Sequence, residues 1–492
     1  MAARLTAFVV VGIVGITLIA GLIVGAQRDD DNGPVDLIVH NGVVFTGDTG
    51  DRPEAVAVRA NQVLKVGSDR EILRLQTPQT VVLDADGAAV VPGFNDAHLH
   101  LVRGGLTLQG VDLKGAATVE EAVERVRNWA SKNPEEPWVV GHGWDESLLD
   151  AIERPTRQAL DAVVPDRPVH LRSADGHYSW VNSTTLQRAG IARRSWDPVG
   201  GRILRDAKGD VVGILEGTAA DLIAGLRPEP TPEERTRALF AAIAEAQRNG
   251  ITSLQNADGE ALDFELLDAA RREGAVDMRV YSALPVHTAR TDDDVAALDD
   301  VLQEYPDDPL FKAGAARVAL DGIDSDALNK LVRLLDARGW QVMIEADTRE
   351  QAEMARTAFQ HAERSNGEPE RPRRHRLEHQ QEHFTAVDGK LALGSNWPDG
   401  PLAPMKVIGS VVPGISLTQA LQAYTVNGAY ASYDEGRKGF IKRGMLADIV
   451  VLSDDIFSLE PAELSKVTVA YTIFDGRVVY PTKQRRLTAP LP

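Results

Sequence analysis

The middle of the chain alternates short apolar runs with amphipathic helical stretches, and this alternation limits the fold more than any other feature. The strand-like runs lie at residues 89–94, 251–255, 278–284, 315–320, 341–345, 375–378 and 391–395. The helical patterns lie at residues 232–248, 260–273, 292–304, 325–338 and 348–365. A repeat of this kind predicts a parallel sheet with crossover helices, and therefore an α/β fold of the TIM-barrel type.

Both ends of the chain are instead rich in short β-branched runs with Gly or Asp between them. We therefore expect a small β domain assembled from residues 36–91 and 436–485, next to a barrel of residues 92–435. The stretch at about 137–230 has its own texture and is predicted to form a subdomain inserted into the barrel.

The N-terminal segment, residues 1–35, predicts an association with a membrane. Residues 7–26 are apolar, with Arg4 before them and Arg28 and three aspartates after them. A helix of about 20 apolar residues can cross the roughly 30 Å hydrocarbon core, and the charges place the body outside the cytoplasm. Two interpretations stay open: an uncleaved transmembrane signal anchor, or a signal peptide cleaved after residues 24–26, which would release a secreted protein.

The amino-acid composition excludes several partners and several kinds of catalytic or metal-binding site. Lys+Arg 53 against Asp+Glu 72 gives a formal net charge of −19, which argues against a nucleic-acid partner. The chain has no cysteine, so disulfides, thiolate nucleophiles and Cys-ligated zinc are excluded. Any metal must be held by histidines and carboxylates.

One motif carries metal-site chemistry. Residues 92–101 read PGFNDAHLHL, and His98 and His100 are two residues apart at the end of a predicted strand. Because strand side chains alternate, both imidazoles face the same side and can bind one metal ion. The carboxyl ends of barrel strands are also where active sites form.

PGFNDAHLHL resembles the first-strand metal motif of the amidohydrolase superfamily, in particular its YtcJ-like branch, amidohydrolase family 3. The most specific support is the block GHGWDESLLDAIERPTRQALDAVVPDRPVHLRSADGHYSWVNSTTLQRAGI at residues 141–191. GILEG at 213–217, RHRLEH at 374–379, LALGSN at 391–396 and GFIKRGMLADIVVLSDD near the C-terminus add to it. The resemblance implies a (β/α) barrel, a composite β-sandwich, a divalent metal such as zinc, and hydrolysis of non-peptide C–N bonds.

The resemblance also assigns site positions, and several hold unexpected residues. His98, His100 and His379 match family metal ligands, and Glu345 stands at a histidine position. Arg317 stands at the position of a carboxylated lysine, and a fixed cation there would repel a metal. Asn396 stands at the position of the general-base aspartate, and an amide cannot accept a proton in this way.

The spacing near the end of the barrel predicts a missing element. His379 and Asn396 are separated by about 17 residues. Two crossovers and an intervening parallel strand do not fit into this length. We therefore expect a barrel that lacks its seventh strand or has an open side.

Four residues of the inserted stretch are candidates for substrate binding: Trp144, Asp145, His177 and Glu216. The alternatives are that Trp144 packs the insert, that His177 caps a turn, and that Glu216 is a solvated glutamate. The expected partners are a small-molecule substrate, the membrane through residues 7–26, and a second copy in a homodimer.

Two functions follow from this site. The first is a metal-dependent hydrolase of C–N bonds such as those of N-acyl or N-formyl amides. The alternative is a catalytically impaired relative, a pseudoenzyme that retains a binding or scaffold role, which Arg317, Asn396 and the missing strand favour.

Overall fold

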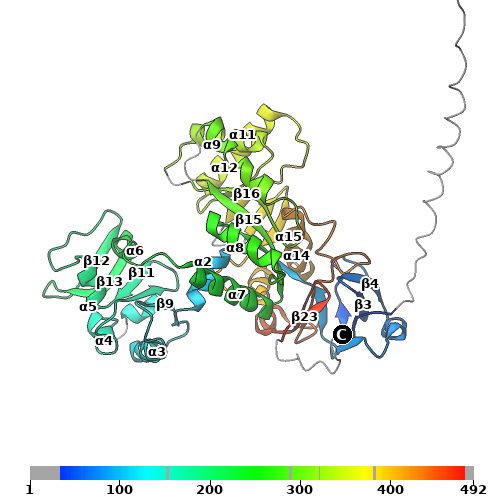
Figure 1. The fold of residues 1–492 in the computed structure, drawn as a ribbon, viewed down its shortest axis with the longest axis horizontal. Coiled ribbons are helices and arrows are strands. Elements are labelled where there is room, and N and C mark those ends of the chain that lie inside the picture. Colours follow the sequence, from blue (N-terminus) through cyan, green and yellow to red (C-terminus); the bar gives the residue numbers. More distant parts are fainter. Residues whose placement is uncertain (1–33, 151–153, 287–290, 321, 380–383, 482–492) are drawn as a thin grey trace, which may run out of the picture.

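The computed structural model describes residues 34–150, 154–286, 291–320, 322–379 and 384–481 (Figure 1). Its centre is an eight-stranded sheet in the order β20-β19-β18-β17-β16-β15-β14-β7. Six of these strands pair in parallel: β7 (Phe94–Leu99), β14 (Ile251–Asn256), β15 (Arg279–Val286), β16 (Phe311–Val318), β17 (Gln341–Glu345) and β18 (Arg376–His379). The fold is therefore a TIM-type α/β barrel.

The crossover helices form where the sequence pattern predicts them. Helix α7 (Pro232–Arg248) begins at Thr231, whose side chain accepts a hydrogen bond from the backbone N–H of Glu234 in a capping box. Its buried face includes Leu239 and Ile243, which join the main hydrophobic core beside β14. The other helices after barrel strands are α2 (Leu101–Leu108), α8 (Ala261–Arg272), α9 (Asp292–Ala296), α10 (Asp299–Glu304), α11 (Ser325–Ala337), α12 (Arg349–Asn366), α13 (Pro404–Val411), α14 (Leu417–Ala423) and α15 (Val426–Ala431).

The expectation of a missing seventh strand is wrong, because the seventh position holds an antiparallel strand. β19 (Phe384–Val387) pairs antiparallel with β18 on one side and with β20 (Lys390–Leu393) on the other. The β19–β20 turn is Asp388-Gly389, with φ of 46° and 73°, as a two-residue hairpin turn requires. An antiparallel strand needs only tight turns, whereas a parallel strand would need a long crossover.

The ring is closed by the residues that follow β20, so the barrel has no open side at this point. The backbone N–H of Asn396 donates to the carbonyl of His98 at 2.8 Å, and that of His100 donates to the carbonyl of Trp397 at 2.9 Å. Gly394 makes this approach possible, because a Cβ there would lie 2.5 Å from the backbone nitrogen of His98.

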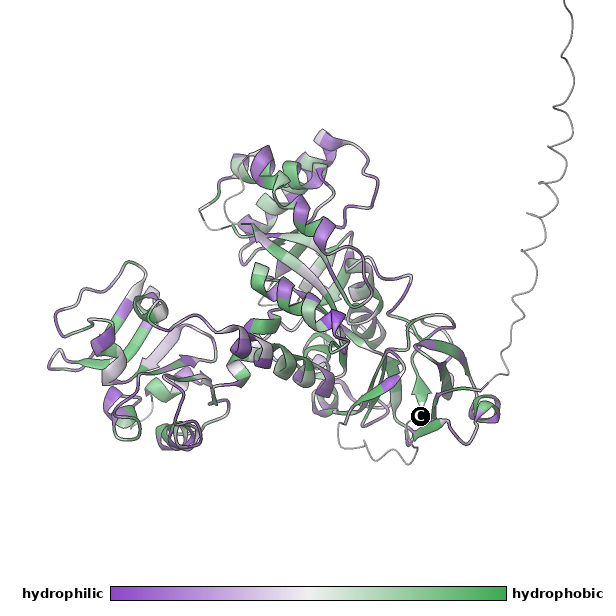
Figure 2. Ribbon diagram, in the orientation of Figure 1, coloured by the Kyte–Doolittle hydropathy of each residue, from purple (hydrophilic) through white to green (hydrophobic). Residues whose placement is uncertain are grey.

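Two sheets built from both chain ends pack as a β-sandwich beside the barrel. One sheet has the order β4-β3-β1-β5 and the other β2-β6-β21-β22-β23. Their strands are β1 (Leu37–His40), β2 (Val43–Val44), β3 (Ala55–Arg59), β4 (Gln62–Gly67), β5 (Val81–Asp84), β6 (Ala89–Pro92), β21 (Ile449–Leu452), β22 (Val469–Phe474) and β23 (Arg477–Tyr480). Helix α1 (Asp69–Ile72) packs against β1 and β3 through Ile72. β6 pairs with β21, and one apolar core joins Val39 and Val56 to Ile449 and Ile473. Figure 2 shows these strands as mostly hydrophobic.

A separate sheet of order β12-β13-β11-β10-β9-β8 projects from the barrel beyond α2 and α7 (Figure 1). Its elements are β8 (Val111–Asp112), α3 (Val119–Lys132), β9 (Val139–Trp144), α4 (Arg157–Asp161), β10 (Val169–Ser173), β11 (Tyr178–Val181), α5 (Ser183–Arg188), β12 (Gly201–Arg205), β13 (Val211–Gly217) and α6 (Asp221–Ala224). The insert therefore begins near Val111, earlier than the expected residue 137, because β8 and α3 complete its sheet and core.

The predicted membrane segment, residues 7–26, lies outside the described residues. None of the helices in the described ranges has both the length and the hydropathy needed to cross a membrane.

Candidate metal centre

Strand β7 brings the two histidines of the HxH motif into the barrel. All six of its residues are buried, and the rings of His98 and His100 lie edge to face with centroids 5.3 Å apart. The buried carboxylate of Asp96 accepts hydrogen bonds from the backbone N–H groups of His98 and Ser395. Burial raises the pKa of Asp96 to about 6, although these hydrogen bonds oppose the rise.

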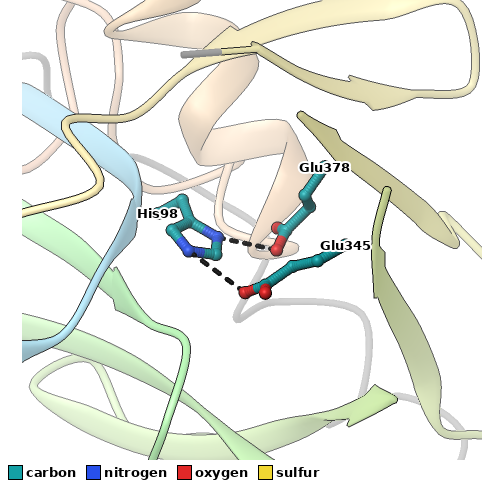
Figure 3. Close-up of side chains that lie close together, drawn as sticks. All are labelled: His98, Glu345 and Glu378. Carbon is teal, nitrogen blue, oxygen red and sulfur yellow. Dashed lines mark hydrogen bonds and ion pairs between the residues drawn. The ribbon is translucent and has the colours of Figure 1, made fainter. Parts of the chain in front are cut away.

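His98 lies between two glutamates from neighbouring strands (Figure 3). Its Nδ1 is 2.7 Å from Oε2 of Glu378 on β18, and its Nε2 is 3.4 Å from Oε1 of Glu345 on β17. One donor atom from each of the three residues lies within 4.8 Å of the others. The structure therefore joins His98 and Glu345, as predicted, and adds Glu378.

Both glutamates are also paired with arginines. Nε and Nη2 of Arg317, on β16, each donate to one oxygen of Glu345 at 2.6 Å. Nη2 of Arg376 lies 2.7 Å from Oε1 of Glu378, and its guanidinium also donates to Gln255 and to the carbonyl of Ala97. The positive charges of the two arginines therefore compensate the negative charges of the two glutamates.

This charge pattern sets the protonation of the group. Burial lowers the pKa of His98, but the carboxylates of Glu378 and Glu345 outweigh burial and raise that pKa above its usual value. Burial raises the pKa of Glu378, but His98 and Arg376 outweigh it and lower that pKa. Glu378 is thus held ionised against Nδ1 of His98.

One observation shows that His98 and Glu345 can bind a divalent metal ion. Nε2 of His98 is buried and has no hydrogen-bond partner among the described residues. It lies 3.4 Å from Oε1 of Glu345, and two ligands of a tetrahedral zinc with bonds near 2.0 Å are about 3.3 Å apart. A carboxylate on the other ring nitrogen, as Glu378 provides, is the usual partner of a metal-ligating histidine.

His100 faces a different carboxylate. Its Nδ1 lies 2.9 Å from Oδ2 of Asp258, in the loop after β14, and Nε of Arg103 lies 3.7 Å from the same oxygen. Burial lowers the pKa of His100. Burial raises the pKa of Asp258, but His100, which lies 2.9 Å away, and the charges of Arg103 and Arg317 lower that pKa overall.

The remaining predicted metal ligand is His379. Its backbone ends β18, whereas its side chain lies outside the described part of the chain. Sequence reasoning missed Glu378 and Asp258, although signals for both exist. Glu378 shares a strand face with Arg376, and Asp258 follows the carboxyl end of a barrel strand.

Asn396 lies at the closure of the barrel, with a φ of 51° and its backbone bonded to His98. Its Oδ1 is buried and has no hydrogen-bond partner in the described structure. Asp399, three residues later, is paired with Arg103 through two contacts of 3.0 Å. The carboxylate nearest in sequence to Asn396 is therefore engaged elsewhere.

The four predicted substrate-binding residues take different positions in the insert. Trp144 is fully buried and donates from Nε1 to the carbonyl of Leu171, so it packs the insert and does not face a substrate. Glu216 is bound by Arg202 at 2.8 Å and lies 3.8 Å from the exposed His177. Asp145 lines a cleft between the insert and the barrel.

The barrel gathers histidine and carboxylate side chains at its strand ends and has a composite β-sandwich beside it. This combination defines the class of amidohydrolase-type metal-dependent hydrolases, which act on C–N bonds. The family model for the amidohydrolase family matches residues 81–386 and 390–480. The chain belongs to this family, in its YtcJ-like branch.

Individual proteins are similar to this chain in sequence or in fold. YtcJ of Bacillus subtilis, assigned to the amidohydrolases, is 28% identical over 90% of this chain and 99% of that protein. An N-substituted formamide deformylase of Arthrobacter pascens is 35% identical over 38% of this chain and 35% of its own length. The structure of an uncharacterised metal-dependent hydrolase from Pyrococcus furiosus has a TM-score of 0.63 and 20% identity, and covers 87% of this chain and 99% of its own.

Proposed function

We propose that this protein hydrolyses the C–N bond of small N-acyl or N-formyl amides with a divalent metal ion, zinc being the expected ion. The observation that carries the proposal is the buried Nε2 of His98, which forms no hydrogen bond with the described residues and lies 3.4 Å from Oε1 of Glu345. The similarity of part of the chain to a protein named N-substituted formamide deformylase supports the substrate class.

In this proposal, His98 and Glu345 hold the metal. When bound, a divalent ion lowers the pKa of a water ligand and polarises a carbonyl oxygen. Glu378 fixes the orientation of His98 through Nδ1, and Arg376 fixes Glu378. Arg317 fixes both oxygens of Glu345, and its positive charge weakens the affinity for a cation.

Proton transfer needs a carboxylate, and Asn396 has none. We assign this role to Asp258, which lies beside His100 at the same end of the barrel and is kept ionised by its surroundings. The amide of Asn396 is left to form a hydrogen bond with the substrate, because its Oδ1 has no partner among the described residues.

The test combines metal content with a substrate panel, on the full chain purified in detergent. We expect partial zinc occupancy that rises to one equivalent with added zinc, and hydrolysis of N-formyl and N-acetyl amides by the loaded protein. His98→Ala is expected to abolish both, whereas His361→Ala, on the outer helix α12, is the matched control and is expected to change neither. Equal zinc binding by the parent protein and His98→Ala would contradict the proposal.

A second candidate function is a catalytically impaired relative that binds amides without hydrolysing them. The bidentate Arg317–Glu345 pair favours it, because it balances a ligand carboxylate without a metal. Amide binding in calorimetry, with no turnover of any substrate in the presence of excess zinc, would identify this function.

We also propose that residues 7–26 attach the protein to a membrane with its body outside the cytoplasm, or direct its secretion after cleavage. Cell fractionation followed by N-terminal sequencing distinguishes these outcomes. An intact N-terminus in the cytosolic fraction would contradict both. Analytical ultracentrifugation tests the proposed homodimer.

A further inference from the structure

A loop at the edge of the insert presents two large apolar side chains to solvent. Residues 192–200 lie between α5 and β12 and read ARRSWDPVG. Trp196 is 93% exposed and Val199 is 98% exposed, the highest values among the exposed large hydrophobic residues of the described structure. Single exposed apolar residues are common on proteins, but these two lie three positions apart on one short loop, which the proposed hydrolase function does not use.

Hydrogen bonds fix the inner side of this loop to the insert. The carboxylate of Asp197 accepts from the backbone N–H of Ile203 at 3.1 Å and from Nη1 of Arg205 at 2.8 Å. The hydroxyl of Thr218 donates to the carbonyl of Val199 at 2.8 Å. The exposed side chains therefore extend from a backbone that is already ordered, so binding through them loses little conformational entropy.

The same contacts cover the free edge of the insert sheet. β12 is the edge strand of this sheet. The backbone N–H of Ile203, in the middle of β12, is bonded to Asp197, and its carbonyl accepts from Arg205 at 2.7 Å. A strand from another chain finds no free backbone groups at this residue. A partner at this end of the insert therefore has to bind the side chains of the loop.

The surroundings of the loop are basic, although the chain as a whole is acidic. Residues 188–208 contain five arginines and one lysine against two aspartates, in a chain with a net charge of −19. Among the described residues, the exposed Arg194 forms no ion pair, and Arg193 has only a 4.0 Å contact with Asp210. Two apolar side chains beside two cations are complementary to a surface that is anionic outside and apolar beneath.

The chain outside the described structure favours a lipid bilayer as this surface. Residues 7–26 are the apolar run that we propose to attach the protein to a membrane. From residue 26 to residue 34, where the described chain begins, a fully extended chain spans at most about 28 Å. Attachment would therefore hold the body close to the bilayer. The described chain enters the sandwich at β1, and the insert lies at the other end of the long axis of the molecule (Figure 1).

We propose that the loop of residues 192–200 is a second membrane contact, in which Trp196 and Val199 enter the interface of an anionic bilayer and Arg193 and Arg194 bind lipid headgroups. Tryptophan prefers this interface because its ring is amphipathic, and each basic residue near an anionic surface favours binding about fivefold. Contacts at both ends place the long axis of the molecule along the bilayer. This orientation rests on attachment through residues 7–26, whereas lipid binding by the loop does not.

The test uses the fluorescence of Trp196 in the full chain, reconstituted in vesicles of phosphatidylcholine and phosphatidylglycerol. Lipids brominated near the headgroup quench only those tryptophans that reach the bilayer. The other six tryptophans of the chain are buried or half-buried: Trp129, Trp138, Trp144, Trp180, Trp340 and Trp397. We expect brominated lipid to quench the parent protein and Trp196→Phe to lose this quenching. Trp129→Phe, on α3 of the same insert, is the matched control and is expected to keep it.

The charge of the loop is tested in the same vesicles. We expect quenching to rise with the share of phosphatidylglycerol and to fall with added salt. Arg193→Ala/Arg194→Ala is expected to lower the ratio of quenched to unquenched Trp196 emission about tenfold or more. Arg349→Ala/Arg364→Ala removes the same charge from exposed positions on α12 and is expected to leave that ratio unchanged.

The outcomes separate this proposal from the others. Quenching that is lost in Trp196→Phe and kept in Trp129→Phe supports the membrane contact, even when no amide is hydrolysed. Protein that floats with the vesicles but shows no quenching, or equal quenching with and without Trp196, overturns the contact while attachment through residues 7–26 stands. Trp196 emission that changes with protein concentration in detergent, without quenching in vesicles, also overturns it and identifies a second copy of the chain as the partner.

Discussion

Arg317 is the residue that most changes what the candidate metal centre can bind. It lies on β16, and its guanidinium takes both oxygens of the predicted ligand Glu345. An arginine stays protonated at any relevant pH, so its charge opposes a divalent cation permanently. A lysine at this position could lose its proton and would release one oxygen of Glu345.

We therefore expect Arg317→Lys to raise the affinity for zinc by about tenfold. Asn396→Asp alone is expected to raise it less and not to give the activity of an intact site, because Arg317 remains. The double variant Arg317→Lys/Asn396→Asp should bind zinc more tightly than either single variant. Zinc titration followed by elemental analysis measures the effect, and stoichiometric zinc with full hydrolysis in Asn396→Asp alone would contradict the argument.

Asp336 is a residue whose ionisation stabilises the fold away from the site. Burial raises its pKa, but hydrogen bonds from His375, Arg373 and Asn366 outweigh burial and lower the pKa to about 2. Because the folded-state pKa is depressed below the unfolded value near 3.9, this stabilisation is present above about pH 5 and is lost as the pH falls toward 2.

Asp336→Asn is accordingly expected to lower the free energy of unfolding at pH 7 by about 2 kcal/mol and to flatten its dependence on pH between about 5 and 2. Urea unfolding at several pH values measures both effects. The exposed Asp347→Asn is the control. An unchanged acid slope in Asp336→Asn would be inconsistent with this assignment.

At the scale of single elements, the β19–β20 hairpin determines how the barrel closes. It replaces a whole strand–helix unit, and its turn depends on positive φ at Asp388 and Gly389. The Asp-Gly signal between two short apolar runs is present in the sequence, but the spacing argument assumed that every barrel strand runs in the same direction. Local pattern indicates a hairpin; only the tertiary structure shows that it fills the seventh position.

Gly389→Ala is expected to destabilise the protein by about 1 kcal/mol. A Cβ at this position meets nothing within 4 Å, so the cost comes from the φ of 73° alone. Gly50→Ala is the matched control, since it too has open space but no positive φ. Equal unfolding midpoints in urea for the two variants would refute the role of the turn.

At the scale of the whole molecule, a buried arginine joins the barrel to the sandwich. Arg279 begins β15, and its guanidinium contacts Asp448 at 2.6 and 3.0 Å and Asp475 at 2.8 Å. Burial lowers the pKa of Arg279, but these carboxylates outweigh burial and raise it well above its ordinary value. The C-terminal strands of the sandwich are therefore tied to the base of the barrel.

Arg279→Ala is expected to lower the free energy of unfolding by about 3 kcal/mol or more, because it leaves buried carboxylates without their partner. We also expect the sandwich to unfold separately from the barrel, as two transitions in calorimetry. Arg477→Ala, which breaks an exposed pair with Asp277, is expected to cost less than about 1 kcal/mol. A single transition and a similar small loss in both variants would show that Arg279 does not join the two parts.

The sequence by itself determined the elements and part of the site. The predicted bounds of α7 and β17 match the structure. Of the predicted site residues, the structure brings His98 and Glu345 together, whereas His100 faces Asp258. These features depend on periodicity, capping and short motifs, which are local in the chain and therefore readable without a fold.

Only the tertiary structure decided which groups meet at the site. Glu378 contacts His98 across 280 positions in the chain, and Asp258 reaches His100 from the next strand of the sheet. The antiparallel direction of β19, and the gathering of Arg103, Lys114 and Arg172 around one cleft, are likewise visible only in the tertiary structure. Such contacts depend on strand order, register and closure of the barrel, and no local pattern of residues contains that information.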